Sequence, residues 1–297
     1  LSKAKISISN DETRHYLNGI YFHKTNLQNK SFLTGVATDS HRLSSSSLEI
    51  DKNIIFEPII LPKKTIFQLC SLLEDYEGEV KISNIKFDGY ESLEKETTIV
   101  GIIFENKFVD KIKLIEDEGY EIDLELLTDS TTFYPEGGGQ VGDIGNIYNS
   151  SFDFKVYDTQ EVIPGIISHF CKLKTKEYAQ NPSILSIGDK VTNSVDSIAR
   201  QDSGKNHTAT HLLHAALRAV LGNHVRQAGS LVEPERLRFD FSHPKAINDD
   251  EIKKIEKIAN TIIKQNELVR TSLMSYKEAI KQGAMALFGE KYEDEVR

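Results

Sequence analysis

The chain has few cysteines and no long apolar segment. Of its 297 residues only Cys70 and Cys171 are cysteine, and they lie far apart and form no CxxC pair. This excludes a disulfide framework and a complete cysteine metal site, so we expect both to be buried or ordinary unreactive thiols. No apolar run approaches the roughly 20 residues that span a bilayer, and Leu1–Lys5 lacks the apolar core of a signal peptide. A cytoplasmic protein without membrane contact is expected.

The negative charge of the chain is concentrated in one segment. The composition is that of an ordinary soluble protein, 39% hydrophobic and 27% charged, with a formal net charge of −9. Residues 1–86 are balanced, with 11 basic and 10 acidic side chains, whereas residues 87–130 hold 13 carboxylates and four lysines. An acidic surface repels phosphate groups, so nucleic acid is expected to contact the other segments. The length allows two or three domains.

The first part of the chain predicts strands followed by a helix. Alternating apolar and polar residues indicate strands over 16–25, 32–39 and 43–50, and the first two form a hairpin. Behind Pro62, apolar residues recur at helical spacing up to residue 73. A further strand is expected before residue 85.

Three phrases of this part, in the same order, resemble a known family. They are Asp11–Phe22 (DETRHYLNGIYF), Val36–Leu43 (VATDSHRL) and Ile60–Lys64 (ILPKK). They resemble the middle domain of the bacterial DNA polymerase III beta subunit, the sliding clamp of DNA replication. The resemblance implies a pocket that accepts short apolar peptides of clamp-binding replication proteins. Carried over, the pocket residues are Leu17, Thr38, His41, Arg42 and Leu43.

The likeness to the clamp is partial. Ser40 occupies a position that is often glycine, which is expected to narrow the pocket. A clamp encircles DNA only as a closed ring of repeated domains, and this chain holds one incomplete copy, so no topological hold on DNA is expected. The domain that supplies the other pocket wall is absent, and an open half-pocket should bind weakly, because a peptide anchor owes much of its affinity to full desolvation.

The rest of the chain predicts a barrel and then a mixed helical part. Short apolar runs separated by Gly, Asn, Asp and Pro indicate a small β-barrel over 97–195. A helix capped by Ser203 and ended by Gly222 is expected next. A strand over 236–241, a helix after Asn248 with isoleucines 252, 255, 258 and 262 inward, and a helix opened by Ser275 complete the prediction.

Two histidines of the first of these helices have the spacing of metal ligands. His207 and His211 are four residues apart, a rise of about 6 Å, so both imidazoles lie on one face. Taken alone, an HxxxH pair is as well explained by two polar residues on an exposed face. His214 is expected to border the core or to donate to a ligand.

The surrounding phrases resemble alanyl-tRNA synthetases. They are FYPEGGGQVGD from Phe133, DTQ from Asp158, NHTATHLLHAAL from Asn206, QAGSLV from Gln227, RFDFSH from Arg238 and GAMALFGEKY from Gly283. The likeness runs from about 87 to 297 and covers the barrel and editing domain of the family, outside its aminoacylation core. The resemblance implies hydrolysis of tRNA(Ala) charged with serine or glycine, in protein biosynthesis.

The resemblance also implies roles for single residues. His207 and His211 become zinc ligands, Thr210 and Gln227 shape the amino-acid pocket, and Gln140 of the glycine-rich loop lies against the site. The remaining ligands belong to a Cys-Gly-Gly-Thr-His phrase expected shortly after Arg297, so the zinc site is incomplete in this chain. His169 and Cys171 are a remote alternative source of ligands.

Together these observations predict an α+β chain that joins two unrelated parts. We expect a sliding-clamp fragment over 1–86, a barrel over 87–200 and a truncated editing domain over 201–297. The expected activity is editing by an alanine–tRNA ligase fragment, without activation of alanine, because nothing resembles the class II catalytic core. The alternatives are a clamp-type binding module, or a chimera with no function as a unit.

Overall fold

The computed structural model describes residues 1–9, 17–73, 85–114, 122–163, 165–173, 183–284 and 295–296. The chain forms two compact units, Leu1–His207 with Gly229–Phe239 and Thr208–Ala228 with Asp240–Arg297. The predicted strand before residue 85 and most of the phrase after Gly283 lie outside the described residues. In the described part of the chain, no helix is long and apolar enough to cross a membrane.

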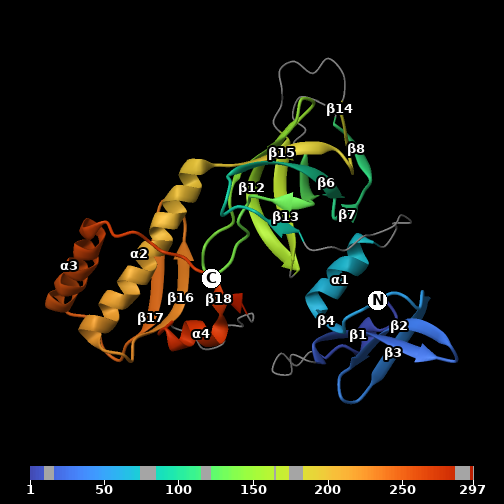
Figure 1. Ribbon diagram of the computed structural model, residues 1–297, viewed down its shortest axis with the longest axis horizontal. Coiled ribbons are helices and arrows are strands. Elements are labelled where there is room, and N and C mark those ends of the chain that lie inside the picture. Colours follow the sequence, from blue (N-terminus) through green and yellow to red (C-terminus); the bar gives the residue numbers. More distant parts are fainter. Residues whose placement is uncertain are drawn as a thin grey trace. The chain divides into compact units, whose positions relative to one another are not determined.

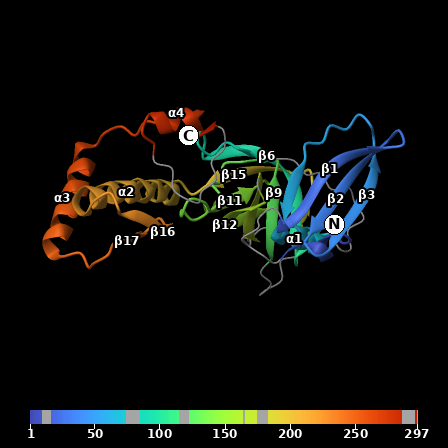
Figure 2. The same cartoon turned by 90° about the horizontal axis from the view of Figure 1, so that it is seen from below.

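A four-stranded antiparallel sheet forms the first part of the chain. Its strand order is β3-β2-β1-β4, and Figures 1 and 2 show β1, β2 and β3 side by side. The predicted hairpin is confirmed, and β4 is a fourth strand that pairs with β1. Ile20, Ala37 and Ile66 are buried in the core of this part. The elements are η1 (Lys5–Ser7), β1 (Gly19–Leu27), β2 (Lys30–Thr38), β3 (Leu43–Ile50), β4 (Ile59–Pro62) and α1 (Lys63–Leu72).

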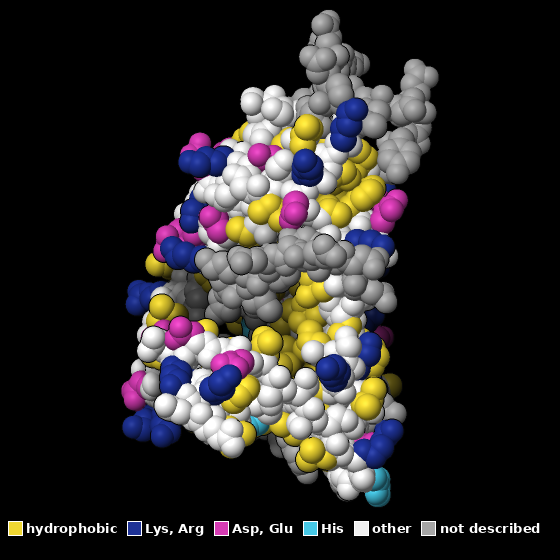
Figure 3. Space-filling model, turned by 90° about the vertical axis from the view of Figure 1, so that its right-hand side faces the viewer, with side chains coloured by type: hydrophobic (Ala, Val, Ile, Leu, Met, Phe, Trp, Pro, Cys, Tyr) yellow, Lys and Arg dark blue, Asp and Glu magenta, His cyan; other side chains and the backbone are white. Residues whose placement is uncertain are grey.

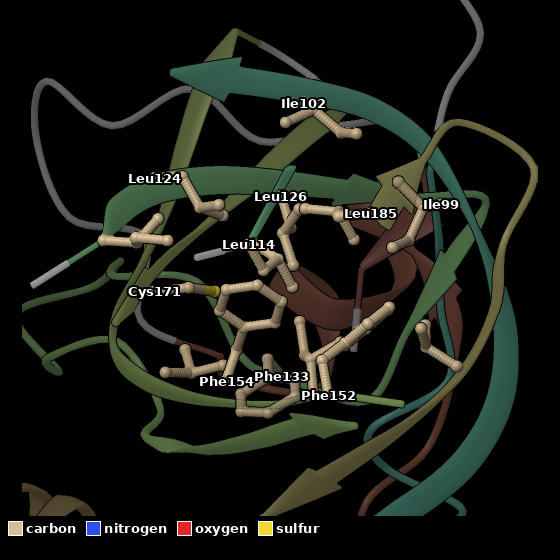
Figure 4. Packing of buried hydrophobic residues seen from close by; sticks show 14 of the residues in the cluster. Ile99, Ile102, Leu114, Leu124, Leu126, Phe133, Phe152, Phe154, Cys171 and Leu185 are labelled. Atoms are coloured by element: carbon tan, nitrogen blue, oxygen red, sulfur yellow. The ribbon is translucent and has the colours of Figure 1, made fainter. Parts of the chain in front are cut away.

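The predicted β-barrel is confirmed and has six strands. The order β15-β11-β12-β13-β9-β6 is closed by pairing of β15 with β6. Its interior is filled by Phe133, Phe152, Phe154 and aliphatic side chains, which converge in Figure 4. The barrel strands are β6 (Glu94–Phe104), β9 (Asp123–Thr128), β11 (Gly145–Tyr148), β12 (Asp153–Ile163), β13 (Ile166–Leu173) and β15 (Lys190–Val195). Shorter strands are β5 (Lys86–Phe87), β7 (Lys107–Phe108), β8 (Lys111–Leu114), β10 (Ser130–Thr131) and β14 (Ser183–Ser186).

The remaining elements are helical with short strands. They are α2 (Ser197–Leu221), β16 (Arg226–Val232), β17 (Leu237–Ser242), α3 (Asp249–Gln265), β18 (Met274–Ser275), α4 (Tyr276–Lys281) and β19 (Glu295–Val296). Asn248 caps α3 in a reciprocal capping box, and the hydroxyl of Ser275 accepts from the backbone N–H of Glu278, as the sequence predicts. Gly222 ends α2 at a φ of +113°.

Two details of these helices differ from the prediction. Ser203 does not cap α2, because the helix begins at Ser197 and the carboxylate of Asp196 accepts from the N–H groups of Ile198 and Ala199. Ser203 is instead buried in the helix. In α3, Ile255 is buried as predicted and Ile258 and Ile262 are half-buried, whereas Ile252 in the first turn is 40% exposed.

Charged side chains are mixed on the surface that Figure 3 shows. Basic and acidic side chains of the described residues alternate there, without a broad area of one sign.

Candidate functional site

The start of α2 is tied to the barrel by Arg200. Its Nε lies 2.7 Å from Asp143 Oδ2, and its terminal nitrogens donate to the carbonyl oxygens of Gly89 and Thr132, each at 2.8 Å. The ion pair is largely removed from water, with side-chain exposures of 17% for Arg200 and 4% for Asp143. Asp143 also accepts from the N–H of Tyr134 at 2.8 Å. The first turn of the helix is thereby held against the barrel wall.

The glycine-rich loop 137–139 brings Gln140 to strand β16. Gly137 and Gln140 exchange two backbone hydrogen bonds of 3.0 Å, and Gln140 forms a parallel bridge with Val232. Gly138 and Gly139 have φ angles of +59° and +82°. The N–H of Val232 donates to Gly139 O at 2.8 Å, and the N–H of Val141 donates to Val232 O at 3.1 Å. The backbone around Gln140 is thus fixed on both sides.

Gln140 contacts the histidine that the sequence predicts as a metal ligand. Gln140 is 6% exposed, and its Oε1 lies 2.8 Å from Nδ1 of His207. Asn206, the preceding residue, donates to the carbonyl oxygens of Glu233 and Pro234 at 2.8 and 3.0 Å. The loop, the helix and the turn after β16 therefore meet at His207.

The other predicted site residues are placed as follows. Thr210 and His211 lie on α2, the first buried and the second exposed, and His214 is buried one turn further on. The helix confirms that His207 and His211 are one turn apart on the same element. Gln227 lies on β16 and is half-buried. Of the predicted residues, Gln140 and His207 are brought into hydrogen-bonding contact.

His169 and Cys171 cannot complete a metal site. Both are fully buried in the barrel, and both ring nitrogens of His169 are engaged, Nε2 with Thr131 Oγ1 at 2.7 Å and Nδ1 with Leu126 O at 2.8 Å. Burial lowers the pKa of His169 to about 4 and raises the pKa of the Cys171 thiol. Within the described residues, no three His, Cys, Asp or Glu side chains are grouped so that they could hold a metal ion.

Four of the predicted peptide-pocket residues, Thr38, His41, Arg42 and Leu43, lie between the end of β2 and the start of β3. Asp39 organises this turn: its Oδ1 accepts from the N–H groups of His41 and Arg42, and its Oδ2 accepts from the Arg42 guanidinium. These bonds, the guanidinium first, lower the pKa of Asp39 to about 2. Thr38 donates to Arg42 O, and Leu43 is 69% exposed. Leu17 is half-buried, and its carbonyl accepts from Ser9.

Two family models match the chain. Residues 1–116 match the DNA polymerase III beta subunit, central domain, and residues 63–199 match the tRNA synthetases class II (A). The two resemblances are confirmed. The matches overlap over 63–116, and the predicted join at 85–87 falls within the overlap.

Curated relatives of the chain are alanine–tRNA ligases. The ligase of Nitrosomonas europaea is 47% identical over 212 residues, and that of Fervidobacterium nodosum is 48% identical over 211 residues. Each alignment covers 71% of this chain, and the chain spans 23% of the length of each ligase. Among solved structures, a Caulobacter crescentus beta sliding clamp is 19% identical, covering 58% of this chain and 61% of the clamp, with a TM-score of 0.24.

The Arg200–Asp143 pair escapes detection from sequence alone. Asp143 stands in the glycine-rich phrase of the synthetase likeness and Arg200 follows the last barrel strand, 57 residues later. No local pattern pairs them, because the contact depends on closure of the barrel. The pair nevertheless places the helix that carries His207.

Proposed function

We propose that the synthetase-like part of the chain hydrolyses tRNA(Ala) wrongly charged with serine or glycine. An aminoacyl ester is already activated, so its hydrolysis needs a positioned water and donors for the developing oxyanion more than a nucleophilic side chain. The proposal is supported chiefly by the contact between Gln140 of the glycine-rich loop and His207 of α2. Two phrases far apart in the sequence, both shared with alanyl-tRNA synthetases, meet at this hydrogen bond.

Zinc is the metal that we propose for this site, with His207 and His211 as its ligands from this chain. Their spacing fits, and the Nδ1 contact of His207 is typical of a histidine ligand whose second nitrogen is held by another group. A bound zinc would orient the attacking water or polarise the ester carbonyl. Zinc needs further ligands, which the family resemblance assigns to a Cys-Gly-Gly-Thr-His phrase expected after Arg297.

Thr210 and Gln227 are proposed to select the amino acid. Thr210 is buried and Gln227 half-buried, and both carry groups that can hydrogen-bond a serine hydroxyl. A site built to pair a hydroxyl discriminates serine from alanine, because alanine leaves the polar groups of the site unpaired. Correctly charged tRNA(Ala) should therefore be spared.

Deacylation by the purified chain tests this proposal. Seryl-tRNA(Ala) should lose its serine faster with the protein and added zinc than without protein, and alanyl-tRNA(Ala) should remain charged. His207→Ala should abolish the reaction, whereas His224→Ala, which alters an exposed histidine in the turn after α2, should not. Absence of deacylation at every zinc concentration would refute the proposal for this chain.

We propose a second, separate activity for residues 1–86, binding of the short apolar peptides carried by clamp-binding replication proteins. The observation in its favour is the turn from Thr38 to Leu43, which Asp39 holds in one conformation with an exposed leucine. A labelled client peptide should bind weakly, Arg42→Ala should weaken it further, and Lys30→Ala on the neighbouring hairpin should not. A flat titration would exclude this activity.

The division of the chain is also a proposal. Ile85 donates to Gly165 O, and β5 pairs with β10, so residues from 85 onward associate with the barrel. This supports a join between the two parts near 85–87, and the cap at Asp196 marks the end of the barrel. Amplification of genomic DNA across codons 80–90 should yield one continuous product. The absence of a product of the expected length, with each half amplifying separately from internal primers, would show that the two parts are not joined in the genome.

A further inference from the structure

The orientation of the Gln140 amide indicates which ring nitrogen of His207 carries the proton that the two side chains share. An amide oxygen accepts hydrogen bonds and cannot donate them, so with Oε1 facing the ring at 2.8 Å the proton lies on Nδ1 of His207. The lone pair of the neutral ring then lies on Nε2. We propose that Gln140 is a positioning residue that holds His207 in this Nδ1–H tautomer.

Both partners of the hydrogen bond are fixed by their own surroundings. Gln140 is almost fully buried, and its backbone is paired with Gly137 and bridged to Val232. On the other side, the amide of Asn206 is held by two carbonyl oxygens of the turn after β16. Because both backbones are held by hydrogen bonds, the Oε1 of Gln140 is already positioned to accept from the ring of His207.

The consequence of the tautomer concerns metal binding and rests on the proposed function. A histidine ligand binds a metal through an unprotonated nitrogen, and its other N–H is held by an outer acceptor that fixes the orientation of the ring. An unconstrained imidazole favours the opposite tautomer, with the proton on Nε2. Gln140 thus removes a proton rearrangement that would oppose metal binding through Nε2.

Substitutions at position 140 separate this role from simple packing. Gln140→Glu keeps an acceptor oxygen and should retain the Nδ1–H tautomer. Gln140→Leu keeps the bulk of the side chain but removes the acceptor, so the Nε2–H tautomer should become the main form. Gln201→Leu, the same substitution at an exposed position of α2, serves as the matched control and should leave His207 unchanged.

Multiple-bond ¹H–¹⁵N correlation spectra of the histidine-labelled, metal-free chain measure the tautomer directly, with the His207 signals assigned by their loss in His207→Ala. We expect the Nδ1–H pattern in the wild type and in Gln140→Glu. An Nε2–H pattern in the wild type would overturn the inference. So would an Nδ1–H pattern that persists in a folded Gln140→Leu. If that variant does not fold, Gln140→Asn, which is too short to reach the ring, replaces it.

A zinc titration followed on the same signals tests the consequence. Loss of the acceptor should weaken zinc binding roughly 10–100-fold, and Gln140→Glu should restore it. Equal affinities in the wild type and Gln140→Leu would refute the positioning role in metal binding. A chain with the expected tautomer that fails to deacylate seryl-tRNA(Ala) would refute the proposed function alone.

Discussion

His169 is a neutral imidazole enclosed by the barrel. Its pKa of about 4 lies below the unperturbed 6.5, because burial penalises the charged ring. The unfolded chain therefore takes up a proton first as the pH falls, and the stability contributed by neutral His169 is lost between about pH 6.5 and pH 4. The loss should reach roughly 3 kcal/mol. Urea unfolding at pH 7, 5.5 and 4 measures this loss of unfolding free energy. In His169→Asn the free energy of unfolding should fall less steeply over the same pH range.

Ser40 has a φ of +76°, in the left-handed region where glycine has no steric penalty. Ser40→Gly should therefore stabilise the first part of the chain, by roughly 0.5–1 kcal/mol after the entropic cost of glycine is subtracted. Ser45→Gly in extended strand β3 is the matched control and should destabilise it by a similar amount. If thermal unfolding showed that both substitutions stabilise the protein, or that both destabilise it, the left-handed backbone at position 40 would not be the cause.

For single residues, the sequence predicts features set by neighbouring residues but not contacts between distant parts of the chain. The left-handed backbone at position 40 accounts for the glycine that the clamp likeness expects there. By contrast, nothing in the sequence shows that both nitrogens of His169 are already engaged inside the barrel. Its partners are Thr131 and Leu126, which precede it in the sequence by 38 and 43 residues. Which residues pair with His169 therefore depends on the register of the barrel strands.

Helix α2 depends on a buried ion pair at its first turn. Removing one partner leaves a charge buried without compensation, which typically costs 3–5 kcal/mol. Asp143→Asn and Arg200→Gln should each lower the free energy of unfolding strongly. The double variant should lower it by less than the sum of the two single effects. Urea unfolding of the wild type, the two single variants and the double variant gives the coupling energy. Lys205→Gln, which removes an exposed ion pair with Asp202 on the same helix, is the control. Additive losses would show that the two side chains do not depend on each other.

The boundaries of α2 illustrate what the sequence predicts at the level of elements. Gly222 marks the helix end correctly because a left-handed terminus favours glycine. The start is predicted seven residues too late, because Ser203 and Asp196 are both good capping residues and only the fold shows which one the chain uses. The helix that carries His207 and His211 is nevertheless assigned correctly, since its apolar period is local.

At the scale of the whole chain, the described residues contain two separate hydrophobic clusters. One fills the barrel, and the other lies under the N-terminal sheet. We expect at least two thermal transitions in calorimetry, because separate cores unfold separately. Ile20→Ala should lower one transition, with a loss of about 2–5 kcal/mol, and Phe154→Ala should lower the other by about 3–5 kcal/mol. A single transition shifted by both variants would indicate one cooperative unit.

The two resemblances are visible from sequence because each rests on several phrases in a fixed order. Sequence similarity does not fix the position of the join, since residues 63–116 match both family models. The barrel follows from strand periodicity, whereas its closure through β15 and β6 joins segments almost a hundred residues apart and requires the structure. The contact of Gln140 with His207 is of the same non-local kind.

The two left-handed glycines of the loop before Gln140 should tolerate change very differently. A Cβ at Gly139 would overlap Ser230 of β16, whereas a Cβ at Gly138 meets no atom within 4 Å. In a saturation library scored for folded protein, position 139 should admit glycine alone, and position 138 should also admit asparagine and aspartate, which accept a positive φ. Gly138 would then tolerate more substitutions than Gly139, because only Gly139 lies against strand β16.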